Sequence, residues 1–91
     1  MNLRKYAQGK PCQIRVPGIC NGNPETTVLA HFRLSGVSGA GIKAPDLLSA
    51  WACSDCHKYV DTRRNDRDTR MFLEGIIRTQ YQLIKEDKIS W

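Results

Sequence analysis

The longest regular pattern of hydrophobic positions lies in the last third of the chain and predicts a helix. Apolar side chains recur there at the three- and four-residue intervals of one helical face: Leu73, Ile76, Ile77, Tyr81 and Ile84. Asn65 or Asp66 can cap its start, and Asp68 places a negative charge in the first turn. Gly75 weakens such a helix by ~1 kcal/mol relative to alanine. We therefore expect a helix over about 66–87, whose apolar stripe packs in the core or forms a dimer face.

Shorter patterns in the first two thirds predict extended segments. Residues 13–16 alternate polar and apolar side chains, and residues 26–34 are β-prone and form the best strand of the sequence. Residues 35–41 contain three glycines and two serines, which predict a flexible loop. The segment 46–52 fits either a short helix or an extended core segment, because it carries three large apolar residues: Leu47, Leu48 and Trp51. We expect Trp51 to lie in the core.

Length and charge narrow the class of protein. The 91 residues indicate a single domain over 1–91. Its core is modest, so it needs a further stabilising element such as a bound metal ion. No apolar run approaches the roughly 20 residues that cross a bilayer, and no apolar segment follows the basic N-terminus. Neither a membrane span nor a secretory signal is therefore expected, and the default location is cytoplasmic. The net charge of +5 favours nucleic acid as a partner, but it also fits a merely soluble basic protein.

Four cysteines form the strongest chemical signal: Cys12, Cys20, Cys53 and Cys56. The last two form a CxxC turn before an expected helix, a spacing that lets both sulfurs face one ion. Cys12 and Cys20 are further apart than usual, but turn signals beside them favour a loop that folds back. Since disulfides do not persist in a reducing cytosol, the set predicts a structural zinc ion. Free structural cysteines and a redox CxxC are the alternatives, and the absence of a βαβ pattern disfavours the redox motif.

The chain has two histidines, and both lie where catalysis could use them. His31 lies inside the best predicted strand, and His57 follows the CxxC turn. Asp61 lies four residues beyond His57, so the two could hold one divalent ion from one helix face. If the strand packs against that helix, His31 could activate a water for metal-assisted phosphodiester hydrolysis. Taken singly, these residues also fit plainer roles: a satisfied strand histidine, a helix-start residue or spare zinc ligand, and an exposed charge.

The order of these features resembles the HNH endonucleases of the ββα-metal superfamily, in their zinc-containing branch. The resemblance is closer still to the small prophage-encoded nucleases of that branch. It covers about residues 10–64 and rests, besides the cysteines, on three motifs: Ala30-His31-Phe32-Arg33, the glycine-rich loop into Lys43-Ala44-Pro45-Asp46, and Cys53-Ser54-Asp55-Cys56-His57. It implies a small zinc-stabilised α+β domain with a ββα-metal, HNH-like core and a C-terminal helix.

The resemblance also implies roles for individual residues. His31 matches the general base that activates water, and His57 matches the last histidine of the motif, a ligand of a catalytic metal that could be Mg, Mn or Zn. Asp46 lies nearest to the place of the family's middle asparagine. Ala30 stands where the family often has a second metal ligand, so the catalytic metal site has one ligand fewer than usual. Asp61 could compensate, because some members space two ligands four residues apart on the helix.

Basic residues near these motifs predict contacts with phosphates. Arg33 lies two residues past His31 and could clamp the scissile phosphate, and similar contacts are expected from Lys43, Arg63 and Arg64. A solvated helix face is the alternative for this charge. We expect a metal-dependent endonuclease that acts on nucleic acid, with DNA as the favoured substrate. The rival functions are a non-catalytic, nucleic-acid-binding zinc module of a phage or prophage, and an interaction domain that docks through its C-terminal helix.

Overall fold

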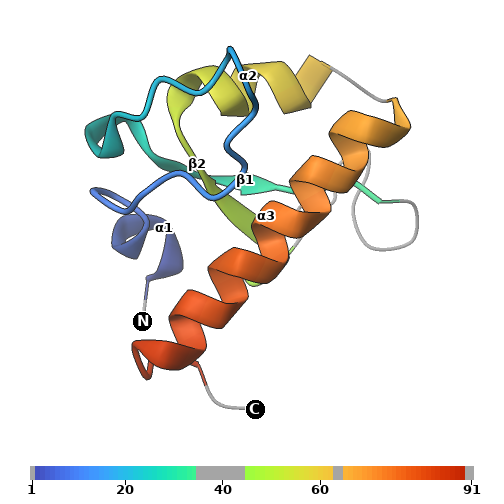
Figure 1. Ribbon diagram of the computed structural model, residues 1–91. Coiled ribbons are helices and arrows are strands. Elements are labelled where there is room, and N and C mark those ends of the chain that lie inside the picture. Colours follow the sequence, from blue (N-terminus) through green and yellow to red (C-terminus); the bar gives the residue numbers. More distant parts are fainter. Residues whose placement is uncertain (1, 35–44, 63–64, 90–91) are drawn as a thin grey trace.

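The computed structural model describes residues 2–34, 45–62 and 65–89 and has the predicted α+β class (Figure 1). Its elements in chain order are helix α1 (Leu3–Tyr6), a short 3₁₀ helix η1 (Pro24–Thr26), strands β1 (Val28–His31) and β2 (Ser49–Ala52), and helices α2 (Ser54–Thr62) and α3 (Asp66–Lys85). The predicted loop over 35–41 falls outside the described residues. In the described ranges, no helix is long and apolar enough to cross a membrane.

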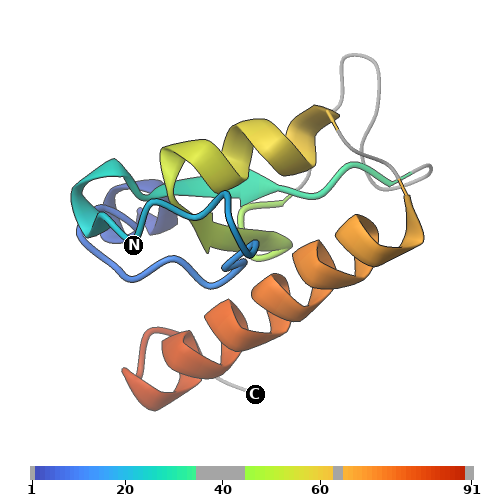
Figure 2. The ribbon, with the colours of Figure 1, turned by 45° about the horizontal axis from the view of Figure 1, so that its top comes forward.

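Strands β1 and β2 form an antiparallel pair between α2 and α3 (Figure 2). The register pairs Val28 with Ala52 at one end and His31 with Ser49 at the other. The predicted strand over 26–34 is thus confirmed in its middle, and 46–52 ends in the extended form rather than a helix. All four residues of β2 are buried, because neighbouring elements cover both its faces and its outer edge.

Two segments from opposite ends of the chain close the outer edge of β2. The Trp51 N–H donates to Oγ1 of Thr79 on α3 at 2.9 Å, and the Trp51 C=O accepts from the Gln13 N–H at 2.7 Å. The Arg78 guanidinium on α3 in turn donates to the Gln13 C=O at 2.7 Å. Backbone groups at a buried strand edge need partners, so a threonine and a loop replace a third strand here.

Residues 13–16, predicted as a short strand, lie beside this edge without forming one. Arg15 has a φ of 56°, in the left-handed region, which interrupts an extended run. Its Nε donates to the Cys12 C=O at 3.1 Å, which holds this bend. The strand prediction is therefore wrong, because the alternating pattern reflects the burial of Ile14 and Val16 from a bent loop.

Helix α3 confirms the predicted helix but buries a different face. Leu73, Ile77 and Tyr81 of the predicted stripe are 44%, 66% and 58% exposed. The buried face consists instead of Asp68, Phe72, Gly75, Ile76, Thr79 and Leu83. These three residues therefore do not pack in the core, because α3 turns the face with Thr79 toward the edge of β2, and a dimer face stays a prediction for them.

Gly75 lies where α3 passes closest to the N-terminal loop. A Cβ at this position would lie 2.9 Å from Cγ1 of Ile14 and 3.2 Å from the carbonyl oxygen of Gln13. Close-packed interiors do not accommodate such short contacts without a shift of the neighbours. The glycine that the sequence marks as weak for a helix therefore has a packing role.

Two hydrophobic clusters follow the alternation of side chains along the strands. The first contains buried cysteines and three alanines of the sheet: Ala30, Ala50 and Ala52. The second contains Trp51, with Leu29 packed against it. Helix α3 contributes Phe72 to the first cluster and Leu83 to the second, and so spans both. The predicted burial of Trp51 is confirmed, at 1% exposure.

Candidate functional site

The four cysteines come together where two distant segments meet. Cys12 and Cys20 bound a loop near the N-terminus, Cys53 directly follows β2, and Cys56 lies in the first turn of α2. Their Sγ atoms all lie within 4.8 Å of one another, and those of Cys20 and Cys53 are 3.9 Å apart. The predicted convergence of the two cysteine pairs is therefore confirmed.

Tight turns bring the N-terminal pair of cysteines together despite its wide spacing. Gly18 and Gly22 have φ values of 77° and 66°, which side chains disfavour and glycine adopts freely. The Val16 C=O accepts from the Cys20 N–H at 2.9 Å, which turns the loop back toward Cys12. The turn signals of the sequence thus have the geometric effect expected of them.

Burial and nearby N–H groups set the ionisation of the thiols. Burial raises the pKa of the Cys53 thiol, but hydrogen bonds from the backbone N–H groups of Cys56 and Asn21 and from the thiols of Cys56 and Cys20 together lower it to about 7. Burial raises the pKa of Cys56 and Cys20, and the neighbouring Cys12 raises both further. Adjacent buried thiolates repel one another, so all four can ionise together only around a cation.

The cysteine cluster fits the size and chemistry of a metal ion with tetrahedral coordination. A zinc ion with four thiolates places its sulfurs about 3.8 Å apart, close to the 3.9 Å between Cys20 and Cys53. Four sulfur donors also leave no open position for a substrate, which is typical of structural sites. An ion held here would join the N-terminal loop to the β2–α2 connection.

His31 is the last residue of β1 and has a carboxylate partner. Its Nε2 lies 2.7 Å from Oδ1 of Asp46, and Nε of Arg4 on α1 lies 3.3 Å from the same oxygen. The hydrogen bond from His31 is the largest influence and lowers the pKa of Asp46. Partial burial opposes it, and the nearby Arg4 lowers the pKa further. The sequence places Asp46 near the family's middle asparagine but gives no signal for these contacts, because Arg4, His31 and Asp46 lie in three separate segments.

Helix α2 carries two more of the predicted site residues, His57 and Asp61. His57 is partly buried, and Asp61, one turn later, is exposed and forms an ion pair with Arg33 at 3.6 Å. Among the described residues, the four cysteines are the one group of three or more potential metal ligands that comes together. The catalytic roles of His31, His57, Asp61 and Arg33 therefore remain predictions. The predicted phosphate contacts Lys43, Arg63 and Arg64 lie outside the described residues.

Comparison with known proteins places the chain in a family. A family model described as "Putative nuclease YbcO" matches residues 1–88. The chain belongs to the YbcO family. Two relatives with that description, from Escherichia coli (strain K12) and Enterobacteria phage 82, are each 51% identical over 93 residues, covering 98% of this chain and 97% of the relative. A solved structure described as a "putative bacteriophage protein" from Escherichia coli K-12 is 46% identical and has a TM-score of 0.78, covering 94% of this chain and all of the other.

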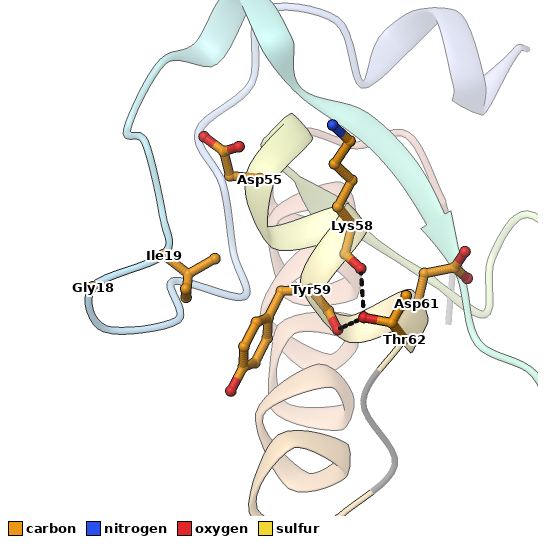
Figure 3. Close-up of a pocket in the computed structure, with 7 residues that line it drawn as sticks. All are labelled: Gly18, Ile19, Asp55, Lys58, Tyr59, Asp61 and Thr62. Atoms are coloured by element: carbon orange, nitrogen blue, oxygen red, sulfur yellow. Dashed lines mark hydrogen bonds between the residues drawn. The ribbon is translucent and has the colours of Figure 1, made fainter.

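A groove on this YbcO-family chain lies between the loop that Cys12 and Cys20 bound and the outer face of α2 (Figure 3). Its volume is about 590 Å³, and its lining residues are Gly18, Ile19, Asp55, Lys58, Tyr59, Asp61 and Thr62. Asp61 thus borders both the groove and Arg33. Sequence reasoning missed this groove, because its walls are a loop and a helix that become neighbours only when the cysteines converge.

Proposed function

We propose that this chain is a metal-dependent endonuclease of the HNH type that hydrolyses phosphodiester bonds of nucleic acid, with DNA as the expected substrate. Its membership in a family described as nucleases supports the reaction class. The observation that carries the proposal is the meeting of β1 and α2, where Arg33, two residues past His31, reaches Asp61. The candidate base thus lies two residues before a cation that pairs with a carboxylate of α2.

In the proposed reaction, His31 takes a proton from the attacking water, whose oxygen then adds to the phosphorus. Arg33 leaves Asp61 and donates to the phosphate oxygens, where charge grows in the transition state. His57 and Asp61 would hold a divalent ion, which when bound stabilises charge on the phosphate and leaving oxygen. The ion pair between Arg33 and Asp61 is consistent with this exchange, because both partners are solvent-exposed, at 67% and 46%.

The four cysteines have a structural part in this proposal, as the ligands of one zinc ion. A zinc ion there would hold the start of α2 against the N-terminal loop and so fix the position of His57 and Asp61. The net charge of +5 supports nucleic acid as the ligand. Binding should weaken as salt rises, because cations released from the phosphates contribute to affinity.

The test is cleavage of supercoiled plasmid by the zinc-loaded protein with Mg²⁺ or Mn²⁺ added. His31→Ala should lower the nicking rate by about 10²–10⁴-fold, the usual effect of losing a general base. Glu25→Ala serves as the control, because Glu25 is an exposed residue of η1 at the other end of β1. Equal rates for the wild type and His31→Ala would overturn the proposed role of this histidine.

The rival function is a zinc module that binds nucleic acid without cutting it. It is favoured by Ala30, which is fully buried where the family often has a metal ligand, and by the lack of a third ligand near His57 and Asp61 among the described residues. A gel shift of plasmid fragments that falls with salt, without nicking, would support this rival. Neither nicking nor a shift would favour an interaction domain instead.

A further inference from the structure

We infer that Asp46 is a positioning residue that fixes the ring of His31 for proton transfer, an inference that rests on the proposed nuclease function. The carboxylate oxygen Oδ1 lies 2.7 Å from Nε2 of His31, within ordinary hydrogen-bond distance. The same oxygen accepts from Nε of Arg4 at 3.3 Å. One carboxylate thus connects the imidazole at the end of β1 to a guanidinium on α1.

The backbone around Asp46 is tied to the strand that carries His31. The Leu48 N–H donates to the Pro45 C=O at 2.9 Å, which closes a turn with Asp46 inside it. The Phe32 N–H donates to the Leu48 C=O at 3.1 Å, directly after the last pair of the strand register. The turn is therefore an extension of the sheet, and the carboxylate has a fixed place relative to the ring.

This contact decides which ring nitrogen can act as the base. An ionised carboxylate accepts only from a protonated nitrogen, so Nε2 carries the proton in the neutral ring and Nδ1 keeps its lone pair. In the proposed reaction, Nδ1 of His31 takes the proton from water while the water oxygen bonds to phosphorus. The resulting imidazolium then has Asp46 beside it, and Nδ1 returns the proton to solvent after the leaving oxygen departs.

Arg4 supports the ionised state of this carboxylate. The hydrogen bond from the His31 ring lowers the pKa of Asp46 most, and the guanidinium of Arg4 adds to this, so the carboxylate is charged at neutral pH. Stability alone gives little reason for the arrangement, because the side chains of His31 and Asp46 are 25% and 35% exposed. Partly exposed ion pairs contribute about 0–1 kcal/mol to stability. Substitution of Asp46 should therefore affect the reaction more than the folding of the domain.

The first measurement is proton NMR of the zinc-loaded protein, which needs no nuclease activity. A hydrogen-bonded Nε2–H of His31 should give a low-field imidazole resonance, assigned by its loss in His31→Gln. Asp46→Ala should remove this resonance, whereas Asp46→Asn keeps an acceptor oxygen and should retain it at higher field. Glu25→Ala, which removes an exposed carboxylate elsewhere, should leave it unchanged. Absence of the resonance from the wild type, or its persistence in Asp46→Ala, would overturn the contact.

The second measurement is plasmid cleavage by the same variants. Asp46→Ala should lower kcat by about 10–100-fold with KM little changed, as for other groups that orient a functional histidine, and Asp46→Asn should recover part of the loss. An unchanged kcat in Asp46→Ala, or a rise in KM alone, would refute the positioning role. A wild type that cuts nothing would refute the nuclease proposal and the positioning role with it, whereas the NMR result would still report whether the His31–Asp46 contact exists.

Discussion

The two ends of helix α2 differ in how completely the fold satisfies their side chains. At its start, the Sγ atoms of four largely buried cysteines lie within 4.8 Å of one another. At its end, Asp61 is exposed and, within the described part of the chain, forms an ion pair with Arg33 at 3.6 Å. The nine residues of α2 span about 13 Å, so the closed and the open site are held at a fixed separation. In the proposed function, the closed end would stabilise the fold through a metal ion, and the open end would bind the nucleic acid.

The largest expected effect tests the closed end. Cys56→Ala, or removal of zinc by a chelator, should unfold the domain, because structural zinc contributes about 10–16 kcal/mol in small zinc modules and the stability of a whole domain is about 5–15 kcal/mol. Circular dichroism melts would report the loss of a cooperative transition, and metal analysis should find one zinc ion per chain. Lys58→Ala, on an exposed position of α2, should melt like the wild type.

An unchanged melt after complete removal of the metal would show that the cysteines are not a staple. The contrast between the two ends of α2 would then lose its physical basis, and packing of the hydrophobic clusters would have to account for the stability of the domain.

The next largest effect tests which face of α3 packs in the core. Phe72→Ala should lower the free energy of unfolding by about 3–5 kcal/mol, because Phe72 is 5% exposed and its ring packs edge-on against Phe32 at 5.1 Å. Ile77→Ala, at 66% exposure, should change it by less than about 0.5 kcal/mol. Urea titrations of the two variants measure both values. Similar losses in both variants would mean that Ile77, like Phe72, is packed in the core.

A smaller effect should come from Gly75, where α3 meets the loop between the first two cysteines. Gly75→Ala improves helix propensity by about 1 kcal/mol but forces a Cβ to within 2.9 Å of Ile14, an overpacking that costs about 1–3 kcal/mol. We expect a net loss of up to about 2 kcal/mol in urea unfolding. A gain in stability would mean that Ile14 moves freely and that the loop is held by the cysteines alone.

The smallest effect on stability should come from the open end. Arg33→Ala and Asp61→Ala should each change the free energy of unfolding by less than about 1 kcal/mol, because both side chains are exposed and screened by solvent. Both variants should lower the rate of plasmid cleavage much more than they lower stability, in contrast to the cysteine variants at the other end of α2. If either variant unfolds the protein while cleavage per folded molecule is unchanged, the pair is a structural contact.

The regions that could be predicted from the sequence are those fixed by near neighbours in the chain. Apolar periodicity predicted the extent of α3, although three residues of its stripe, Leu73, Ile77 and Tyr81, are exposed rather than packed in the core. The CxxC spacing and the turn residues Gly18 and Gly22 predicted that the cysteines converge. The strand predicted from the alternation at 13–16 is absent. The left-handed φ of Arg15 is set by the loop that contains it, and the alternation of polar and apolar side chains does not reveal it.

The sequence by itself determined the cysteine cluster, the main helix and the presence of His31 in a strand, since local spacing and backbone preferences are sufficient for these. Only the tertiary structure decided which face of α3 is buried, that Thr79 and Gln13 close the edge of β2, and that Asp46 and Arg4 meet at His31. These contacts join residues far apart in the chain. Their partners depend on how the elements pack in three dimensions, which no local pattern of side chains encodes.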